Sequence, residues 1–315
     1  MLELVRPGTQ IDFVGKKNLW MLLSLLSLGL TIILFFTRGL NYGIDFTGGA
    51  EVQLRLDPVW EIGKLREELE LGGLKSLKVQ QIGLPVENQY LIQSQGEEGN
   101  LNLVAKNVES ILEKKLKKEQ FEIQRVDVVG PQAGSSLRMS GFLSMFYALL
   151  CILIYVHFRF DYRYSPGAVL ALFHDTVVTL GIFMITQKQF DLQILAALLA
   201  LIGYSNNDTI IVYDRVRETV ERHPELSIDK AVNRAINETL GRTLLTSLCT
   251  WISVFSLWLL GGKVIEDFAF TLMVGIAVGT YSSIFVASSL VIFMTEFYER
   301  RWKRGKRSRA PVVVG

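Results

Sequence analysis

The chain alternates between long apolar runs and one long polar segment. A helix needs about 20 mostly apolar residues to cross a bilayer. Six runs approach or exceed this length, at residues 19–36, 141–156, 167–185, 192–213, 243–260 and 268–293. Residues 39–137 instead hold 26 charged side chains, 11 basic and 15 acidic. The pattern predicts an α-helical polytopic membrane protein with six transmembrane helices and one folded domain between the first and second helices.

Within residues 39–137 the apolar positions change their period. Four stretches have the alternating or short apolar pattern of strands, and two have the spacing of amphipathic helices. The strands are expected at 51–56, 74–82, 87–93 and 121–129, and the helices at 58–71 and 101–118. The resulting order β-α-β-β-α-β predicts an α+β ferredoxin-like module. Such a fold does not by itself identify a function.

Basic residues indicate how the chain crosses the membrane. Lys and Arg concentrate in the short cytoplasmic loops of membrane proteins. With the N-terminus inside, 18 basic residues fall on the cytoplasmic side, and the two short outer loops hold only Lys188 and Lys263. Both termini are therefore expected in the cytoplasm and the α+β domain on the exoplasmic side. The expected segments are 1–38 with the first helix, the domain 39–137, helices two to six in 138–298, and a basic tail, 299–315.

A further amphipathic stretch lies near residues 228–240, just before the fifth run. Its apolar residues recur at helical spacing, and they are Ile228, Ala231, Val232, Ala235, Ile236 and Leu240. We expect a helix that lies along the cytoplasmic membrane interface. It is either a passive surface helix or an elbow that transmits motion.

Composition argues against several classes of protein. The two cysteines, Cys151 and Cys249, both lie inside apolar runs, so no disulfide framework or zinc site is expected. No metal-ligand spacing, P-loop or serine-protease loop is present, and an enzyme is not expected. We also expect no bound cofactor and no nucleic-acid partner.

Ionisable groups inside the apolar runs are the strongest functional signal. A charge within the bilayer costs several kcal/mol and usually marks a pathway or a partner. Asp208 lies roughly 8 Å from the middle of the fourth run on its cytoplasmic side, and Arg242 stands at the cytoplasmic start of the fifth. If the two meet, protonation of Asp208 releases Arg242 and the helices shift. Alternatively, Arg242 reaches the lipid headgroups and Asp208 only bonds a neighbour.

Other polar and small residues of the apolar runs have two readings each. His174 and Asp175 in the third run, and Asn207 in the fourth, either handle protons or bond structurally to adjacent helices. Arg242 begins a polar stripe that lines a hydrated path or packs on another helix, and its other members are Thr246, Cys249, Ser253 and Ser256. A stripe of small residues allows close helix packing, within the chain or with a partner, and it includes Gly275, Gly279 and Ser283.

Six short motifs give the chain a specific resemblance. They are Asn-Tyr-Gly-Ile-Asp-Phe-Thr-Gly-Gly at 41–49, with Gly43, Asp45, Gly48 and Gly49; Val-Gly-Pro at 129–131, with Gly130 and Pro131; Ala-Leu-Phe-His-Asp at 171–175; Ile-Gly-Tyr-Ser-Asn-Asn-Asp-Thr at 202–209; Asn-Glu-Thr-Leu-Gly-Arg-Thr at 237–243; and the segment 275–285. Together they resemble the SecF branch of the SecD/SecF family, in the RND superfamily. Asn206 and Gly241 depart from the family pattern, and neither removes a proposed proton-handling group.

The resemblance implies a half-transporter of the bacterial inner membrane, partnered by SecD. It implies that the pair uses the proton gradient to help draw unfolded preproteins from the SecYEG translocon at a late, exoplasmic stage. Asp208 and Arg242 match the family's membrane Asp and Arg, and Gly43, Gly48 and Gly49 form either a hinge or a fixed tight turn. Membrane lipid is an expected contact, and insertase and accessory subunits are further candidate partners. Two alternatives remain: a proton-driven exporter of small molecules or lipids, and a scaffold that transports nothing.

Overall fold

The computed structural model describes residues 10–57, 59–74, 77–82, 87–94, 101–160 and 165–308. The chain divides into two compact units. The sheet unit comprises residues 41–144 and 189–195, and the helical unit comprises 1–40, 145–188 and 196–315. The predicted basic tail falls beyond the side chains described, which end before residue 299.

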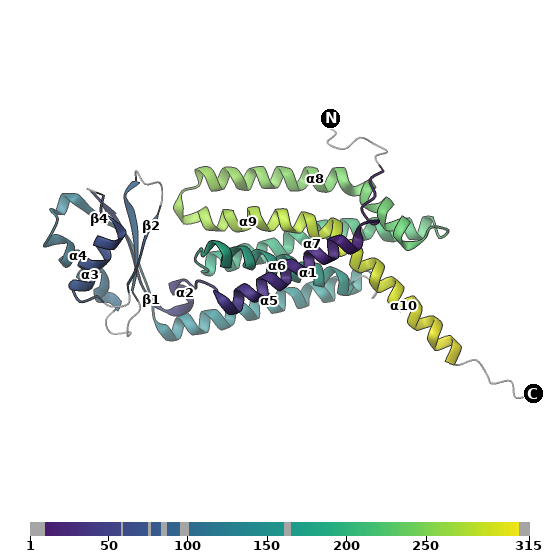
Figure 1. The fold of residues 1–315 in the computed structure, drawn as a ribbon, viewed down its shortest axis with the longest axis horizontal. Coiled ribbons are helices and arrows are strands. Elements are labelled where there is room, and N and C mark those ends of the chain that lie inside the picture. Colours follow the sequence, from purple (N-terminus) through teal and green to yellow (C-terminus); the bar gives the residue numbers. More distant parts are fainter. Residues whose placement is uncertain are drawn as a thin grey trace, which may run out of the picture. The chain divides into compact units, whose positions relative to one another are not determined.

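The sheet unit contains one four-stranded antiparallel sheet. Its strands are β1 (Gly49–Leu56), β2 (Leu77–Ile82), β3 (Gln89–Ser94) and β4 (Phe121–Val129), in the spatial order β2-β3-β1-β4. The helices α3 (Ile62–Leu71) and α4 (Leu101–Glu113) lie together on one face of the sheet (Figure 1). The chain order and the strand order are those of a ferredoxin-like module, which confirms the prediction.

The alternating pattern of β1 produces the core of the sheet unit. Ala50, Val52 and Leu54 point toward the two helices and are fully buried. Two predicted helix boundaries differ: α4 ends at Glu113 rather than at residue 118, and α3 begins at Ile62 rather than at residue 58. Tyr90 of β3 explains the second difference: its hydroxyl donates to the carbonyl oxygen of Trp60 at 2.6 Å and accepts from the Trp60 amide at 3.1 Å. These bonds hold Trp60 outside the helix.

The first glycine-rich motif forms a closely packed junction within the sheet unit. It includes the short helix α2 (Ile44–Thr47), followed by Gly48 at φ +73°. A Cβ atom on Gly48 would lie 2.5 Å from the Cα atom of Pro131, the first residue of α5 (Pro131–Arg159). A Cβ on Gly134 would lie 2.7 Å from the Gly48 nitrogen. The two motifs therefore touch through bare backbone, and only glycine leaves room for this contact.

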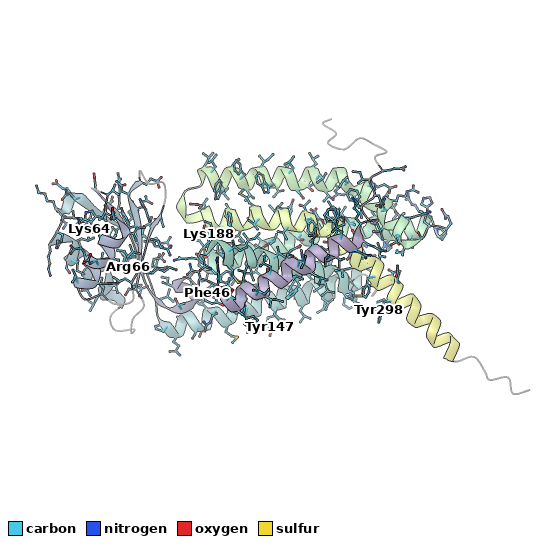
Figure 2. The ribbon with its side chains drawn as sticks, viewed as in Figure 1. Phe46, Lys64, Arg66, Tyr147, Lys188 and Tyr298 are labelled. Atoms are coloured by element: carbon cyan, nitrogen blue, oxygen red, sulfur yellow. The ribbon has the colours of Figure 1, made fainter. Side chains whose placement is uncertain are left out.

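The same motif also binds the start of the fourth long helix, α7 (Leu192–Arg222). Asp45 Oδ2 accepts a hydrogen bond from the Leu192 amide at 3.1 Å, which satisfies one free N–H at the helix start. Phe46, labelled in Figure 2, stacks on Phe190 with the ring centroids 5.5 Å apart. These contacts describe a fixed turn, and the hinge role of Gly43, Gly48 and Gly49 stays a prediction.

Six long apolar helices account for the rest of the chain. They are α1 (Lys17–Thr37), α5, α6 (Ser165–Thr186), α7, α8 (Ile228–Leu260) and a sixth helix whose membrane span is Ile265–Tyr298. All six are long and apolar enough to cross a membrane. The sixth is built from α9 (Lys263–Tyr281), a π-helical segment (Ser282–Ala287) and α10 (Ser288–Ser308). We call Ser282–Ala287 the π-stretch. The six-span prediction is confirmed.

A helix is present at residues 228–240, as predicted, and its position at the membrane interface stays a prediction. These residues are the first part of α8, which continues without a break for 33 residues, roughly 50 Å against a hydrocarbon core of about 30 Å. The apolar face of this part packs within the helical unit. Val232 and Ile236 are buried with Val212 and Val216 of α7, so the chain's own helices cover the surface that the sequence pattern assigned to the membrane interface.

The start of the described chain is held by the same part of α8. Asn233 Oδ1 accepts from the amides of Phe13 and Val14, and its Nδ2 donates to the Ile11 carbonyl. One helical turn on, Asn237 bonds both the amide and the carbonyl of Ile11 at 2.8 Å. Two side-chain amides thus fix a non-helical segment of backbone against α8.

Replacement of Gly48 tests the backbone junction. Gly48→Ala should lower the local stability of the sheet unit by about 1–3 kcal/mol, because the new methyl group meets the Pro131 backbone at a strained φ. Native-state hydrogen exchange of the β1 and β4 amides in the full chain in detergent measures the loss. Gly63→Ala is the matched control: nothing lies within 4 Å of its Cβ, and stability should stay unchanged or rise by up to about 1 kcal/mol. Wild-type protection in Gly48→Ala would contradict the packing argument.

Glu51 of β1 gives a pH-dependent prediction. Burial raises the pKa of this carboxyl above its usual 4.5, although the Gln93 amide donates to it at 2.6 Å. The folded sheet unit therefore holds a proton more tightly than the unfolded chain, and stability falls as the pH rises from 4.5 through the raised pKa. Glu51→Gln should be more stable than the wild type at pH 7, and the difference should vanish below pH 4.5. Hydrogen-exchange protection of β1 and β3 at both pH values tests this, and equal protection at pH 7 would refute it.

Candidate functional site

Asp208 of α7 is buried in the helical unit. Only 1% of the surface of this residue is exposed. Oδ2 accepts a hydrogen bond from Ser247 Oγ of α8 at 3.1 Å, whereas Oδ1 has no partner among the described residues. A buried polar atom without a partner is uncommon and calls for an explanation. Asp208 is thus a carboxylate with one bonded oxygen and one open oxygen.

Arg242 is not a hydrogen-bond partner of Asp208 in this structure. In the part of the chain that the structure describes, Oδ2 bonds Ser247 and Oδ1 bonds no side chain, so the guanidinium acts on the carboxylate only through a longer-range Coulombic attraction. The geometry of α8 explains the separation. Ser247 and Thr243 are four residues apart on its buried face, and Arg242 is about 140° around the helix from Ser247, on an exposed face. That the two residues act together stays a prediction.

The polar stripe that begins at Arg242 is exposed along α8. Its hydroxyl groups bond to carbonyls of their own helix: Thr246 to Arg242 at 3.0 Å, and Ser253 to Cys249 at 2.9 Å. No described residue of the chain covers this face. The stripe therefore satisfies its own hydrogen bonds and leaves one side of α8 open to another helix or to water.

A second polar cluster surrounds Asp175 of α6. Asp175 Oδ2 accepts from Ser205 Oγ of α7 at 2.6 Å and from Ser282 Oγ of the π-stretch at 2.8 Å. Oδ1 lies 3.1 Å from Nδ1 of His174, so the two adjacent side chains do bond to each other. Asp175 is 1% exposed and His174 is 3% exposed. The His174 Nε2 atom has no partner among the described residues.

Sequence reasoning missed three serines of these clusters. Ser205 and Ser282 complete the Asp175 cluster, and Ser247 is the direct partner of Asp208. One signal was available for Ser205, which lies three residues before Asp208 and hence near it on the same helix. Asn207, a predicted proton-handling residue, is exposed and enters neither cluster by any hydrogen bond described here.

The small residues of the sixth helix pack against α7. A Cβ atom on Gly275 would overlap the side chain of Leu201, and one on Gly279 would lie 3.0 Å from Ser205 Oγ. Ser283 is fully buried, and its hydroxyl donates to the Thr280 carbonyl at 3.1 Å. Gly279 therefore leaves the room in which Ser205 reaches Asp175. Among the described residues, no group of three or more His, Cys, Asp or Glu side chains is placed to hold a metal ion.

Comparison with protein families gives two matches. Residues 108–297 match the family "Protein export membrane protein SecD/SecF, C-terminal", and residues 33–58 match "SecD/SecF GG Motif". The second match contains Gly48, and the first contains the Pro131 and Gly134 side of the same junction together with Asp175 and Asp208. The two clusters therefore lie in regions whose sequence pattern a known family shares.

Individual proteins of this family are similar to the chain along nearly its whole length. Protein translocase subunit SecF of Calditerrivibrio nitroreducens is 42% identical over 303 residues, covering 95% of this chain and 99% of that one. The SecF of Pseudomonas aeruginosa is 36% identical, with 92% and 93% covered. The crystal structure of SecDF, a translocon-associated membrane protein from Thermus thermophilus, matches with 36% identity and a TM-score of 0.83. The match covers 92% of this chain and 39% of that longer one.

Several lines of observation thus agree. The chain has six spans, a ferredoxin-like module between the first two, and relatives that match it almost end to end. It is a multi-pass membrane protein and a translocase accessory subunit rather than a classical enzyme. The chain belongs to the SecD/SecF family of protein-export membrane proteins, as the SecF-type subunit that works with a SecD partner in protein translocation.

Proposed function

We propose that this subunit, together with SecD, uses the proton gradient to help draw unfolded preproteins out of the SecYEG translocon at a late, exoplasmic stage. It does so in the bacterial inner membrane, with both termini in the cytoplasm and the α+β domain outside. Protons are the coupling ion, and no bound cofactor takes part. The observation that carries the proposal is the buried carboxylate of Asp208 with its open oxygen.

Asp208 has the properties that a proton-binding trigger requires. An ionised carboxylate within an apolar bundle is costly unless several donors surround it. Ser247 gives one bond, and the Oδ1 atom retains free lone pairs for a proton. Protonation removes the buried charge, and deprotonation restores it. The free energy of the α7–α8 contact therefore depends on whether a proton is bound.

Arg242 provides the charge that responds to Asp208. Its attraction to the ionised carboxylate disappears when Asp208 is neutral. Arg242 lies on an exposed face of α8, so its guanidinium is free to move toward the carboxylate or toward another partner. The protonation state thus changes the interaction between α7 and α8, which is the local event that a switching element requires.

The membrane potential is large enough to drive this step. Moving one charge through it supplies about 2.3 kcal/mol per 100 mV. Two states that differ by a few kcal/mol can be interchanged by such an input. The excess of basic residues in the inner segments supports the orientation, and the open polar stripe of α8 supports a path beside a second six-span half. SecD is the subunit that supplies this half.

Asp208→Asn should abolish the proton-dependent stimulation of preprotein release while the complex with SecD still assembles. The Asn side chain keeps the shape of Asp, and its amide oxygen can still accept the hydrogen bond from Ser247. Unlike a carboxylate, the amide does not take up a proton at physiological pH. Release from inverted vesicles with and without an imposed gradient measures the effect. Asp214→Asn is the matched control on the same helix: Asp214 is half-exposed and paired with Arg159 at 3.1 Å, so stimulation should remain. Normal stimulation in Asp208→Asn would favour a scaffold role instead.

Arg242→Ala should also remove proton-dependent stimulation, because Asp208 then has no mobile cation to attract or release. Arg242→Lys keeps the charge and should retain part of the stimulation. Lys230→Ala on the exposed surface of the same helix is the control and should behave as the wild type. The same vesicle assay, normalised to the amount of co-purified SecD, distinguishes lost coupling from lost assembly. Full stimulation in Arg242→Ala would show that this cation is not part of the trigger.

A further inference from the structure

Asp175 connects three transmembrane helices through one carboxylate. Its own helix is α6, Ser205 belongs to α7, and Ser282 is the first residue of the π-stretch in the sixth helix. Both hydroxyls donate to the same oxygen, Oδ2, and His174 Nδ1 approaches the other oxygen. Unlike Asp208, Asp175 therefore has a partner at each oxygen. Breaking one of these bonds would leave a buried charge poorly satisfied.

The π-stretch is an irregular part of the sixth helix, and a neighbouring helix bonds each of its ends. A π-helical turn departs from the regular α-helical ladder, and such turns frequently occur at functional sites. Ser282 begins the π-stretch and is held by Asp175 at 2.8 Å. Ala287 ends it, and its carbonyl accepts a hydrogen bond from the buried Tyr213 hydroxyl of α7 at 3.1 Å. Both ends of the π-stretch are thus tied to α7, one of them through Asp175.

Asp208 lies between these two ties along α7. It follows Ser205 by three residues and precedes Tyr213 by five. A change in the rotation or height of α7 at Ser205 therefore moves Asp208 relative to Ser247. In the opposite direction, a shift of α7 caused at Asp208 reaches the π-stretch through the same ties. Gly279, against which Ser205 packs, permits the close approach of the two helices.

We propose that Asp175 is a positioning residue, whose carboxylate ties Ser205 of α7 to Ser282 of the π-stretch and so sets the placement of Asp208. The inference rests on the proposed function of Asp208. It assigns to Asp175 a different task from proton carriage. Asp175 accepts hydrogen bonds from Ser205 and Ser282, shares a third with His174 and stays bonded, while Asp208 gains and loses the proton.

The groups around Asp175 contain few other charges. Those that act electrostatically on its carboxyl, within the described chain, are its three hydrogen-bond partners, and only His174 among them can carry a charge. From the sixth helix, the titratable side chain of Tyr281 also lies beside the cluster, and the centroid of its ring is 6.4 Å from that of His174. Tyr281 shares a 3.0 Å hydrogen bond with Ser24 of α1 and donates to the Trp20 carbonyl. The cluster is therefore built mainly from neutral donors.

A neutral amide separates positioning from proton carriage. In Asp175→Asn the amide oxygen can accept from Ser205 and Ser282, and its NH₂ group can donate to His174 Nδ1 in the other tautomer. A positioning role is then preserved, whereas a proton carrier is lost. Asp175→Ala removes every acceptor and should release α7 from the π-stretch.

The experiment uses the full chain with SecD and SecYEG in vesicles, and it measures gradient-stimulated preprotein release as a function of pH. We expect Asp175→Asn to stay within about twofold of the wild type and Asp175→Ala to fall about tenfold. In complexes that co-purify normally, Asp175→Ala should also move the pH midpoint of stimulation, because Asp208 then sits in a changed environment. Thr176→Val is the matched control, since among the described residues this buried neighbour on α6 bonds the Leu172 carbonyl of its own helix and no other helix.

Three results would overturn the inference. Asp175→Asn as inactive as Asp208→Asn, with assembly intact, would make Asp175 a proton carrier. Asp175→Ala with the wild-type rate and pH midpoint would show that the tie does not matter. If Asp175→Ala fails to assemble, the variants Ser205→Ala and Ser282→Ala test the proposal instead, because each removes one hydrogen-bond donor to Asp175. Wild-type release in both serine variants would contradict the proposal. Failure of the proposed function is seen separately, as normal stimulation in Asp208→Asn.

Discussion

Two carboxylates buried among apolar helices impose the main constraint on this structure. A charge in such surroundings needs donors, and the two residues meet this need differently. Asp175 has partners at both oxygens, drawn from three helices, whereas Asp208 has Ser247 at one oxygen and an open second oxygen. The saturated carboxylate suits a permanent structural tie. The unsaturated one suits a site whose proton comes and goes, and the bundle thus separates positioning from switching.

The helix α7 connects these two tasks. Three residues within a stretch of nine bond its neighbours. Ser205 bonds Asp175 of α6, Asp208 bonds Ser247 of α8, and Tyr213 bonds the carbonyl of Ala287 at the end of the π-stretch. Small residues make this possible, because Gly275 and Gly279 let the sixth helix lie directly against α7. A serine hydroxyl can reach across a helix contact only where the backbones are this close. The glycines therefore support the polar clusters without taking part in any chemistry.

The sheet unit follows a different physical rule. Its signature residues act by being small or by capping, since Gly48 admits the Pro131 backbone and Asp45 satisfies an amide at the start of α7. The module itself is a common fold and carries no indication of its cargo. Its importance for the membrane helices lies in the chain segments it shares with them: α5 and α7 both begin in the sheet unit and continue into the helical unit.

The sequence by itself determined the six spans, the β-α-β-β-α-β order and the buried acids as the residues of interest. These follow from local hydropathy and period, which neighbouring residues alone define. Only the tertiary structure decided which faces meet. It joined α8 into one helix, gave Asp208 Ser247 rather than Arg242 as its hydrogen-bond partner, and brought Ser205 and Ser282 to one carboxylate. Such contacts depend on how whole helices are rotated and packed against one another, so they cannot be predicted from the local sequence of any one helix.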